Sequence, residues 1–443
     1  MKILNISKSF PIEKSSSQQI TEYFGKLDFD EPWSFKGYTQ KDTNYISHRY
    51  HRYPAKFIPQ VAARLIKELS EPADLICDPF MGSGTTLVEA KVLGRSSIGI
   101  DINPVAYLIA KVKVTSIKPE TLEDYWKKLN LEIASAQNSS FKEAISPTRL
   151  QNERIDYWFK PETKKSLGII YSNINEIKNR DVKNFFLCGF SNILKNCSIW
   201  LMKSSKPTRD FNKIIPDPYE TFAKHIRIII KRNKIFWNLL QENGALKCST
   251  KPICGDARKI PVEDSSVTLV VTSPPYVTSY EYADLHQLTA IWFGYSKNLP
   301  EFRKDFIGSV YREEENIFIG SKIGEDVVRE LKEKNTGKSN EVAIYFSEMR
   351  ESFLEMHRYL KRGGKTCIVI GDTAFKGVNV LNAEVFVEQM LNIGFSVYKI
   401  IKREIPSKIL PSTRDCLTGR FTSSANHNKT LAYPFEYIII MEK

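Results

Sequence analysis

The sequence lacks the features that would place the chain in a membrane or a secretory pathway. No run of about 18 apolar residues, the length that spans a bilayer, occurs among its 443 residues. The first 20 residues, MKILNISKSFPIEKSSSQQI, contain no uninterrupted apolar segment of the kind that a secretory signal needs. We therefore expect a cytoplasmic protein without membrane association.

The cysteines lack the spacing of a metal or redox site. Their seven positions are 77, 188, 197, 248, 254, 367 and 416. No two of them form a CxxC pair, which excludes the common zinc and thioredoxin-like motifs. The six histidines show no metal-ligand spacing either. We expect reduced thiols and no bound metal.

Negative charge is in deficit. Lys and Arg number 64 against 51 Asp and Glu, a formal excess of +13 that fits a polyanionic partner such as nucleic acid. A hydrophobic share of 42% is enough for a substantial core. The length favours either one domain with a large insertion or two domains.

Strand and helix signals alternate in two parts of the chain, residues 48–115 and 249–443. The first part has a helical pattern from Ile58, the strand ADLICDPF, a glycine-bearing turn, a helix and the strand SSIGIDINP. The second part resumes at PICGDARKIP and SSVTLVVTSPPY, continues through a helix expected at residues 345–364 and ends at FEYIIIME. This alternation predicts an α/β fold with a doubly wound, mostly parallel sheet covered on both faces.

Three segments depart from the alternation. Residues 1–47 have no clean period and are expected to form an irregular or partly helical lead-in. Residues 116–248 carry long amphipathic helical patterns with few strand signals, which predicts a helical insertion. Residues 297–340 are charged, contain several glycines and lack sustained apolar periodicity, so we expect a long loop there.

The turn DPFMGSG, residues 78–84, follows the first strand of the alternating pattern. An open α/β sheet binds its ligand at this place, and glycine lets the backbone approach the ligand closely. Asp101 ends the next strand, where a carboxylate can accept hydrogen bonds from both ribose hydroxyls of an adenosine. The turn lacks the third glycine of GxGxxG, so an adenosine-containing cofactor is favoured over a nicotinamide dinucleotide.

Two further carboxylates are candidates for the same ligand. Asp256, in CGDARKIP, is placed to bond an adenine amino group, and Asp78 is placed to hold a positively charged methionine end. The alternative for each of these carboxylates, and for Asp101, is a solvated side chain in a turn.

A second loop, TSPPY (residues 272–276), closes the apolar strand VTLVV. Consecutive prolines cannot extend a β-ladder, because they lack N–H donors, but they provide a rigid loop with exposed carbonyls. An exocyclic base amine is a poor nucleophile until acceptors hold its hydrogens. The Ser273 hydroxyl and the Pro274 carbonyl are two such acceptors, and Tyr276 is placed to stack on an extruded base. The alternative is a purely structural Pro-Pro turn.

Together the two loops resemble the amino-methyltransferases of DNA, whose signatures are FxGxG and (D/N/S)PP(Y/F). They stand here as FMGSG at residues 80–84 and SPPY at residues 273–276. The resemblance implies S-adenosyl-L-methionine as cofactor, double-stranded DNA as substrate, and direct displacement on the sulfonium methyl. No Pro-Cys pair of the kind that attacks C6 of cytosine is present. Serine in the first position is similar to the cytosine-N4 branch, since adenine-N6 members more often carry Asp or Asn.

The resemblance also implies a seven-stranded sheet with a reversed final hairpin, formed by strands near 397–403 and 436–441. It gives HRYPAKF, residues 51–57, a place against the methionine portion of the cofactor, although this segment could also be only an aromatic-rich loop. In many cytosine-N4 enzymes the catalytic loop comes first, whereas here the cofactor loop precedes it by about 190 residues. By analogy with this family, a restriction endonuclease is the expected partner.

These arguments define two sets of site residues. The catalytic set is Ser273, Pro274, Pro275 and Tyr276. The cofactor-binding set is Lys56, Phe57, Asp78, Pro79, Phe80, Gly82, Gly84, Thr85, Asp101, Ile102, Asp256 and Ala257.

Basic clusters in the insertion are candidates for contacts with DNA phosphates, which position DNA without reading its sequence. The insertion, and secondarily residues 297–340, are therefore candidate target-recognition regions. Some of these cations can equally be the solvated face of amphipathic helices. The residues expected to contact DNA are Lys203, Lys206, Arg209, Lys213 and Arg232.

Three other functions fit parts of the pattern. A serine hydroxyl can also hold the amino group of adenine, which keeps adenine-N6 methylation open. An RNA amino-methyltransferase can use a similar PPY loop on guanine N2, but no appended RNA-binding module is evident. A catalytically silent nucleic-acid-binding protein would have lost one of the two loops, and both are intact.

Overall fold

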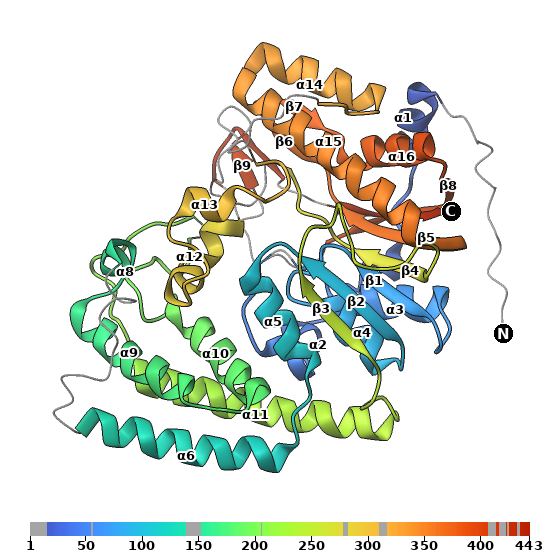
Figure 1. The fold of residues 1–443 in the computed structure, drawn as a ribbon. Helices are drawn as coiled ribbons and strands as arrows, with labels where there is room; N and C mark the ends of the chain where they lie inside the picture. The colour runs from blue at the N-terminus through green and yellow to red at the C-terminus, as the bar shows by residue number, and fades with distance from the viewer. Residues whose placement is uncertain are drawn as a thin grey trace.

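The computed structural model gives the arrangement of most of the chain. Figure 1 shows a sheet at the centre of one part of the molecule and a group of helices beside it. The residues that the structure describes are 16–54, 56–138, 152–204, 206–277, 282–309, 317–405, 413–415, 422, 425–431 and 435–443.

Seven strands form the central sheet, in the order β3-β2-β1-β4-β5-β11-β8. All neighbouring pairs are parallel except those of β11, which runs antiparallel to both β5 and β8. The expected mostly parallel sheet with a reversed final hairpin is therefore confirmed. The strands are β1 (Leu75–Asp78), β2 (Ser96–Asp101), β3 (Thr250–Cys254), β4 (Val267–Thr272), β5 (Leu360–Ile370), β8 (Ser396–Glu404) and β11 (Phe435–Glu442).

Both faces of the sheet are buried, which is why its strands are apolar runs rather than alternating ones. Ile76 packs in one core with α3 (Pro59–Leu69), whereas its neighbour Cys77 packs in another with α15 (Thr336–Tyr359) and α16 (Asn382–Ile393). The sheet is also flanked by α1 (Ser17–Gly25), α4 (Thr85–Val92) and α5 (Pro104–Val114). The alternation predicted from the sequence thus becomes a doubly wound layer structure.

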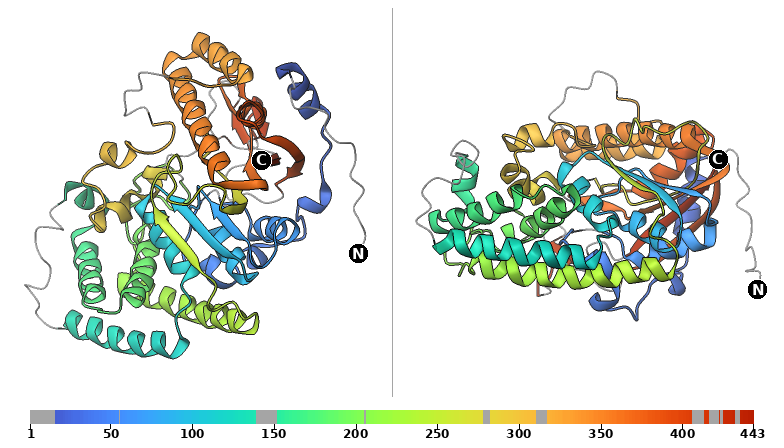
Figure 2. Two further views of the ribbon diagram at one scale, coloured as in Figure 1. Left: turned by 45° about the vertical axis from the view of Figure 1, so that its right-hand side comes forward. Right: turned by 60° about the horizontal axis from the view of Figure 1, so that its bottom comes forward.

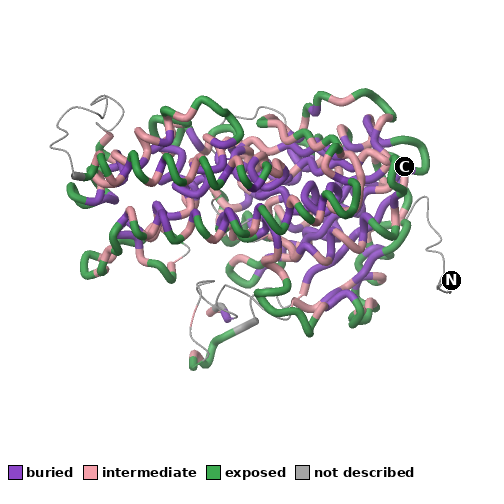
Figure 3. The backbone as a smooth tube through the Cα atoms, turned by 90° about the horizontal axis from the view of Figure 1, so that it is seen from below, coloured by how far each residue is buried: buried purple, intermediate pink, exposed green. Residues whose placement is uncertain are grey.

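The expected helical insertion lies beside the β3 edge of the sheet. Its helices share one core with residues of α5 and of α12 (Tyr282–Trp292), so they are packed onto the sheet layer. Figure 2 shows α6 and α11 lying along each other in both views, and Figure 3 shows the buried residues on the inward sides of the helices. The helices are α6 (Pro119–Asn138), α8 (Glu153–Trp158), α9 (Pro161–Asn175), α10 (Arg180–Leu194) and α11 (Pro218–Glu242).

The prediction of a long loop at residues 297–340 is wrong for most of that segment. Within it the structure has α13 (Leu299–Arg303), α14 (Lys322–Lys334) and the beginning of α15, while residues 310–316 lie outside the described part. In α14 the buried Ile323, Val327 and Leu331 form a narrow apolar stripe with one residue per turn. Ion pairs on its charged side, such as Lys322 with Asp326, stabilise it. Because charged residues predominate in this segment, the apolar stripe was not recognised in the sequence.

The lead-in is partly helical, as expected, although residues 1–15 lie outside the described part. Among the described residues, no helix combines the length and the apolar character needed to cross a bilayer. One expected boundary is wrong, because the helix predicted to reach Gly364 ends at Tyr359 and β5 begins at Leu360. The remaining elements are η1 (Glu31–Trp33), α2 (Gln40–Thr43), η2 (Ile46–Arg49), β6 (Thr373–Phe375), β7 (Val378–Val380), β9 (Thr413–Asp415) and β10 (Lys429–Leu431).

Candidate active site

A cavity of about 760 Å³ opens at the carboxyl ends of β1, β2, β3 and β4. This is the edge at which an open α/β sheet binds its ligand. Residues of the loops after all four strands line it, and residues 299–309 and α15 complete the wall. The predicted residues that line it are Lys56, Phe57, Pro79, Phe80, Gly82, Thr85, Asp101, Ile102, Asp256, Ala257, Ser273, Pro275 and Tyr276.

The turn after β1 needs its glycines. Gly82 has a φ of +47°, and a Cβ there would lie 3.3 Å from the ring of Tyr53. Gly84 has a φ of +78° and begins α4, where a Cβ would come within 3.0 Å of Ala110. Both positions favour glycine. The expected backbone approach therefore applies to Gly82, which lines the cavity, while Gly84 allows α4 to pack closely on α5.

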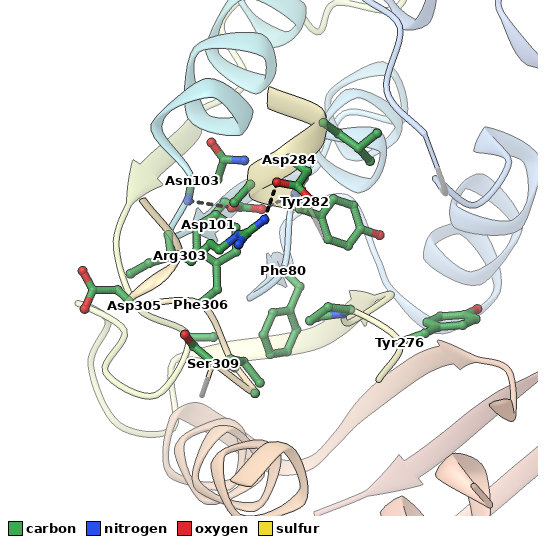
Figure 4. A pocket seen from close by; sticks show the side chains of 18 of the residues that line it. Phe80, Asp101, Asn103, Tyr276, Tyr282, Asp284, Arg303, Asp305, Phe306 and Ser309 are labelled. Carbon is green, nitrogen blue, oxygen red and sulfur yellow. Dashed lines mark hydrogen bonds and ion pairs between the residues drawn. The ribbon is translucent and has the colours of Figure 1, made fainter. Parts of the chain in front are cut away.

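Asp101 presents a carboxylate held in place by backbone donors. The Gly82 N–H donates to Oδ2 and the Asn103 N–H to Oδ1, both at 2.9 Å. Burial raises the pKa of Asp101 to about 6. Figure 4 shows Asp101 beside Asn103, and Tyr276 across the view with Phe80 between them. Each Asp101 oxygen retains a lone pair for a further donor, as a pair of ribose hydroxyls requires.

Asp78 does not line the cavity. It is buried at the end of β1, where it accepts hydrogen bonds from the Thr272 hydroxyl at 2.6 Å and from the Phe80 N–H at 3.2 Å. Burial raises the pKa of Asp78 to about 7. The contact with Thr272 joins the turn after β1 to the end of β4. Its role at the methionine end of a cofactor stays a prediction.

Asp256 is fixed by a charged partner. The Arg258 guanidinium pairs with its carboxylate at 2.7 Å and also contacts Glu348 of α15. The Gly308 N–H donates to the other Glu348 oxygen at 2.6 Å. These contacts connect the loop after β3 to α15 and to residues 299–309, which form part of the cavity wall.

The loop after β4 is anchored on both sides. The Tyr345 hydroxyl of α15 donates to the Pro275 carbonyl at 2.7 Å, and the Tyr276 hydroxyl donates to Glu436 at 3.2 Å. Glu436 in turn pairs with the buried Arg403. Ser273 and Tyr276 line the cavity, whereas Pro274 is buried beneath it. The loop is therefore held on two sides, with Ser273, Pro275 and Tyr276 at the cavity wall.

The five predicted DNA contacts do not form one surface. Lys206 lines the cavity, and Lys203 and Arg209 are exposed on the same connection between α10 and α11. The Lys213 ammonium donates to three backbone carbonyls, of Lys195, Ser198 and Trp200, at 2.6–2.9 Å. Its half-burial lowers its pKa to about 8. Lys213 therefore has a structural role, and Arg232 lies separately on α11.

Several cavity residues had no signal in the sequence, because they come from distant helices. Tyr345 on α15 and the ion pair of Arg303 with Asp284 line the wall. Tyr53, within the predicted segment HRYPAKF, stacks near Tyr282, and its ring occupies the space that a Cβ on Gly82 would need. Only Asn103 had a detectable signal, because an Asn before a Pro marks the start of a helix.

A family model described as DNA methylase matches residues 7–112 and 267–443, more than half of the chain. The chain belongs to the DNA methylase family. The cofactor loop and the Pro-Pro-Tyr loop fall within the matched parts, and the whole helical insertion, residues 116–248, lies between them. A DNA methylase takes its methyl group from S-adenosylmethionine, so this is the cofactor of the methylase described here, and DNA is its substrate.

Two type II methyltransferases match this chain over most of its length. The type II methyltransferase M.MvaI of Kocuria varians is 27% identical over 437 residues, which cover 92% of this chain and 93% of that protein. M.BsoBI of Geobacillus stearothermophilus is 25% identical, with 82% and 81% covered. A putative DNA modification methylase of Thermus thermophilus, solved with S-adenosyl-L-methionine, is 21% identical, covers 43% of this chain and 53% of that chain, and has a TM-score of 0.21.

The residues present fit this cofactor. The cavity volume suits a ligand of its size, Gly82 lines the cavity with its backbone alone, and Asp101 presents a partly buried carboxylate to the same space. We expect Asp101 to hold the ribose and the residues around Phe80 and Ala257 to enclose the adenine.

Replacing Tyr345 with Phe should lower kcat about 2- to 10-fold. The change removes one neutral hydrogen bond, to the Pro275 carbonyl, and keeps the packed ring. Transfer of labelled methyl groups to plasmid DNA gives kcat and KM. Tyr398→Phe, at an exposed tyrosine of β8, serves as the control. An unchanged kcat together with a lower melting temperature would assign Tyr345 to stability alone.

Proposed function

We propose that this methylase is a site-specific enzyme that methylates N4 of cytosine in double-stranded DNA. The observation that carries the proposal is Ser273, a hydroxyl rather than a carboxylate or amide, at the cavity wall at the start of the Pro-Pro-Tyr loop. A biological role in type II restriction-modification is supported by the names of M.MvaI and M.BsoBI. A cognate restriction endonuclease is the partner that this role implies.

The residues of the Pro-Pro-Tyr loop have different roles toward the base. We assign the Ser273 hydroxyl to a hydrogen of the amino group, so that its lone pair turns toward the methyl donor. Pro274, the other predicted acceptor, does not line the cavity. Tyr276 covers the face of the extruded base. The cofactor supplies an electrophilic methyl group, and Asp101 with the Gly82 turn holds the donor at fixed distance from the loop.

Adenine-N6 methylation is the second candidate. The matching family model covers both N6 and N4 enzymes, and a hydroxyl can accept from either amine. The Ser273 position favours cytosine because no carboxylate or amide side chain stands there. The helical insertion, residues 116–248, is our candidate for reading the target sequence.

Nucleoside analysis tests the base assignment. The full-length protein is incubated with unmethylated plasmid DNA and labelled S-adenosylmethionine, and the DNA is digested to nucleosides and separated by chromatography. We expect the label in N4-methylcytosine. Label only in N6-methyladenine would overturn the cytosine assignment, and label confined to added RNA would overturn the substrate class. The Tyr276→Ala protein, prepared identically, controls for contaminating methylases.

A further inference from the structure

A short antiparallel hairpin, described at residues 199–204 and 206–210, lies in the connection between α10 and α11. The Leu201 N–H donates to the Thr208 carbonyl at 2.9 Å, and the Asp210 N–H to the Ile199 carbonyl at 2.7 Å. An antiparallel bridge pairs Trp200 with Arg209. These bonds fix the backbone of the hairpin. The paired segments are too short to give a strand signal in the sequence.

The base of the hairpin is fixed to the rest of the molecule. Lys213 binds three carbonyls beneath it, as described above. Trp200 stacks on Trp158 of α8, with ring centroids 5.0 Å apart and 21° between the planes. The Trp158 indole N–H donates to Gln287 of α12 at 3.2 Å. The hairpin therefore keeps its orientation relative to α12, which lines the cavity.

The outer side of the hairpin combines cations with exposed apolar groups. The Arg209 guanidinium lies 4.0 Å from the Tyr157 ring centroid and 4.7 Å from that of Phe211. Phe211 is 66% exposed and Ile214 is 93% exposed. The hairpin carries Lys203, Lys206 and Arg209 against a single acid, Asp210. DNA is a polyanion whose bases are stacked apolar rings, so its phosphates can bind the cations of this surface and its bases can contact the exposed apolar side chains.

The tip of the hairpin reaches the active site. Lys206 and Pro207 line the same cavity as Ser273 and Tyr276. A base that enters this cavity must leave the duplex, and its flanking phosphates then lie near the cavity mouth. The Lys206 side chain is exposed, so its ammonium can meet a phosphate there.

We propose that this hairpin holds duplex DNA at the extruded nucleotide. Lys206 binds a phosphate beside that nucleotide, and Phe211, with the Arg209 guanidinium against it, contacts the duplex next to the vacated position. The hairpin thus stabilises the opened duplex and does not read the sequence. This inference rests on DNA being the substrate and is independent of which amino group is methylated.

Two variants of the full-length protein test the proposal by fluorescence anisotropy with a 30-base-pair duplex, over a series of salt concentrations. Lys206→Ala should weaken binding about 5- to 10-fold and reduce the slope of log K against log salt by about 0.9, since one phosphate contact is lost. Phe211→Ala should weaken binding about 10-fold with the slope unchanged, because a stacked contact is lost instead. Both side chains are exposed, so the melting temperatures should stay at the wild-type value.

Lys332→Ala on α14 and Leu354→Ala on α15 are the matched controls, one exposed cation and one exposed apolar residue outside the helical insertion. Wild-type affinity and slope in both hairpin variants would overturn the proposal. If Phe211→Ala binds DNA normally but abolishes a dimer seen by light scattering, the surface belongs to a second copy, which also overturns it. A wild-type protein that transfers no methyl group to DNA would instead count against the enzymatic assignment.

Discussion

Replacing Tyr276 with Ala should lower kcat for DNA methylation by at least about 100-fold while changing the affinity for S-adenosylmethionine less than about 2-fold. A base stacked on an aromatic side chain gains about 1 to 3 kcal/mol, and the variant also loses the hydroxyl bond to Glu436 that anchors the loop. Tyr276 stands across the cavity from Asp101. Single-turnover methyl transfer measures the chemical step, and isothermal titration measures cofactor binding.

The Tyr276→Phe protein separates the two functions of this side chain. It keeps the ring and loses the hydroxyl with its bonds to Glu436 and Ser273, so kcat should fall no more than about 10-fold. Burial raises the pKa of Tyr276 well above its usual value, so the hydroxyl stays protonated and the loss should be the same from about pH 6 to pH 9. An equal loss of cofactor affinity in Tyr276→Ala would show that the ring supports the cofactor and not the base.

The two loops could be predicted from sequence because each is local. Residues 78–84 and 273–276 carry their chemistry within a few positions, and each follows an apolar strand that places it at the same edge of the sheet. The distance between them along the chain, about 190 residues, does not matter once β1 and β4 pair in parallel. The contact of Asp78 with Thr272 is a product of that pairing.

The opposite wall of the cavity could not be predicted, since its residues have no local signature. Tyr345 lies in the middle of a helix of 24 residues and reads as an ordinary core aromatic. Lys213, expected to contact DNA, proved to hold three carbonyls, because a single sequence cannot tell a solvated cation from one that caps a turn. In α14 charged residues outnumber the apolar residues on its buried side. The composition of the segment therefore suggested a loop.

Replacing Asp101 with Ala should raise the dissociation constant for S-adenosylmethionine about 100-fold or more. Each hydrogen bond to a charged acceptor contributes about 1.5 to 3 kcal/mol, and a ribose offers two hydroxyls. The change also leaves the Gly82 and Asn103 N–H groups without their acceptor, which loosens the turn after β1. Isothermal titration at about pH 8, above the pKa of the carboxyl, measures the affinity, and kcat at saturating cofactor should fall less than the affinity does.

Asp101→Asn gives the sharper form of this test, because the amide keeps the shape and one acceptor while it removes the charge. The pKa of about 6 means that wild-type affinity should be nearly complete from about one pH unit above that value and should weaken as the pH falls through it, since protonation removes an acceptor. Asp78, with a pKa of about 7, titrates in both proteins, but the Asp101 charge helps to raise that pKa, so Asp101→Asn should move the Asp78 step to lower pH as well as remove the step near pH 6. Asp74→Asn, at the opposite end of β1, should leave the profile unchanged. Equal pH profiles in the wild type and Asp101→Asn would show that Asp101 maintains the turn and does not bind the ribose.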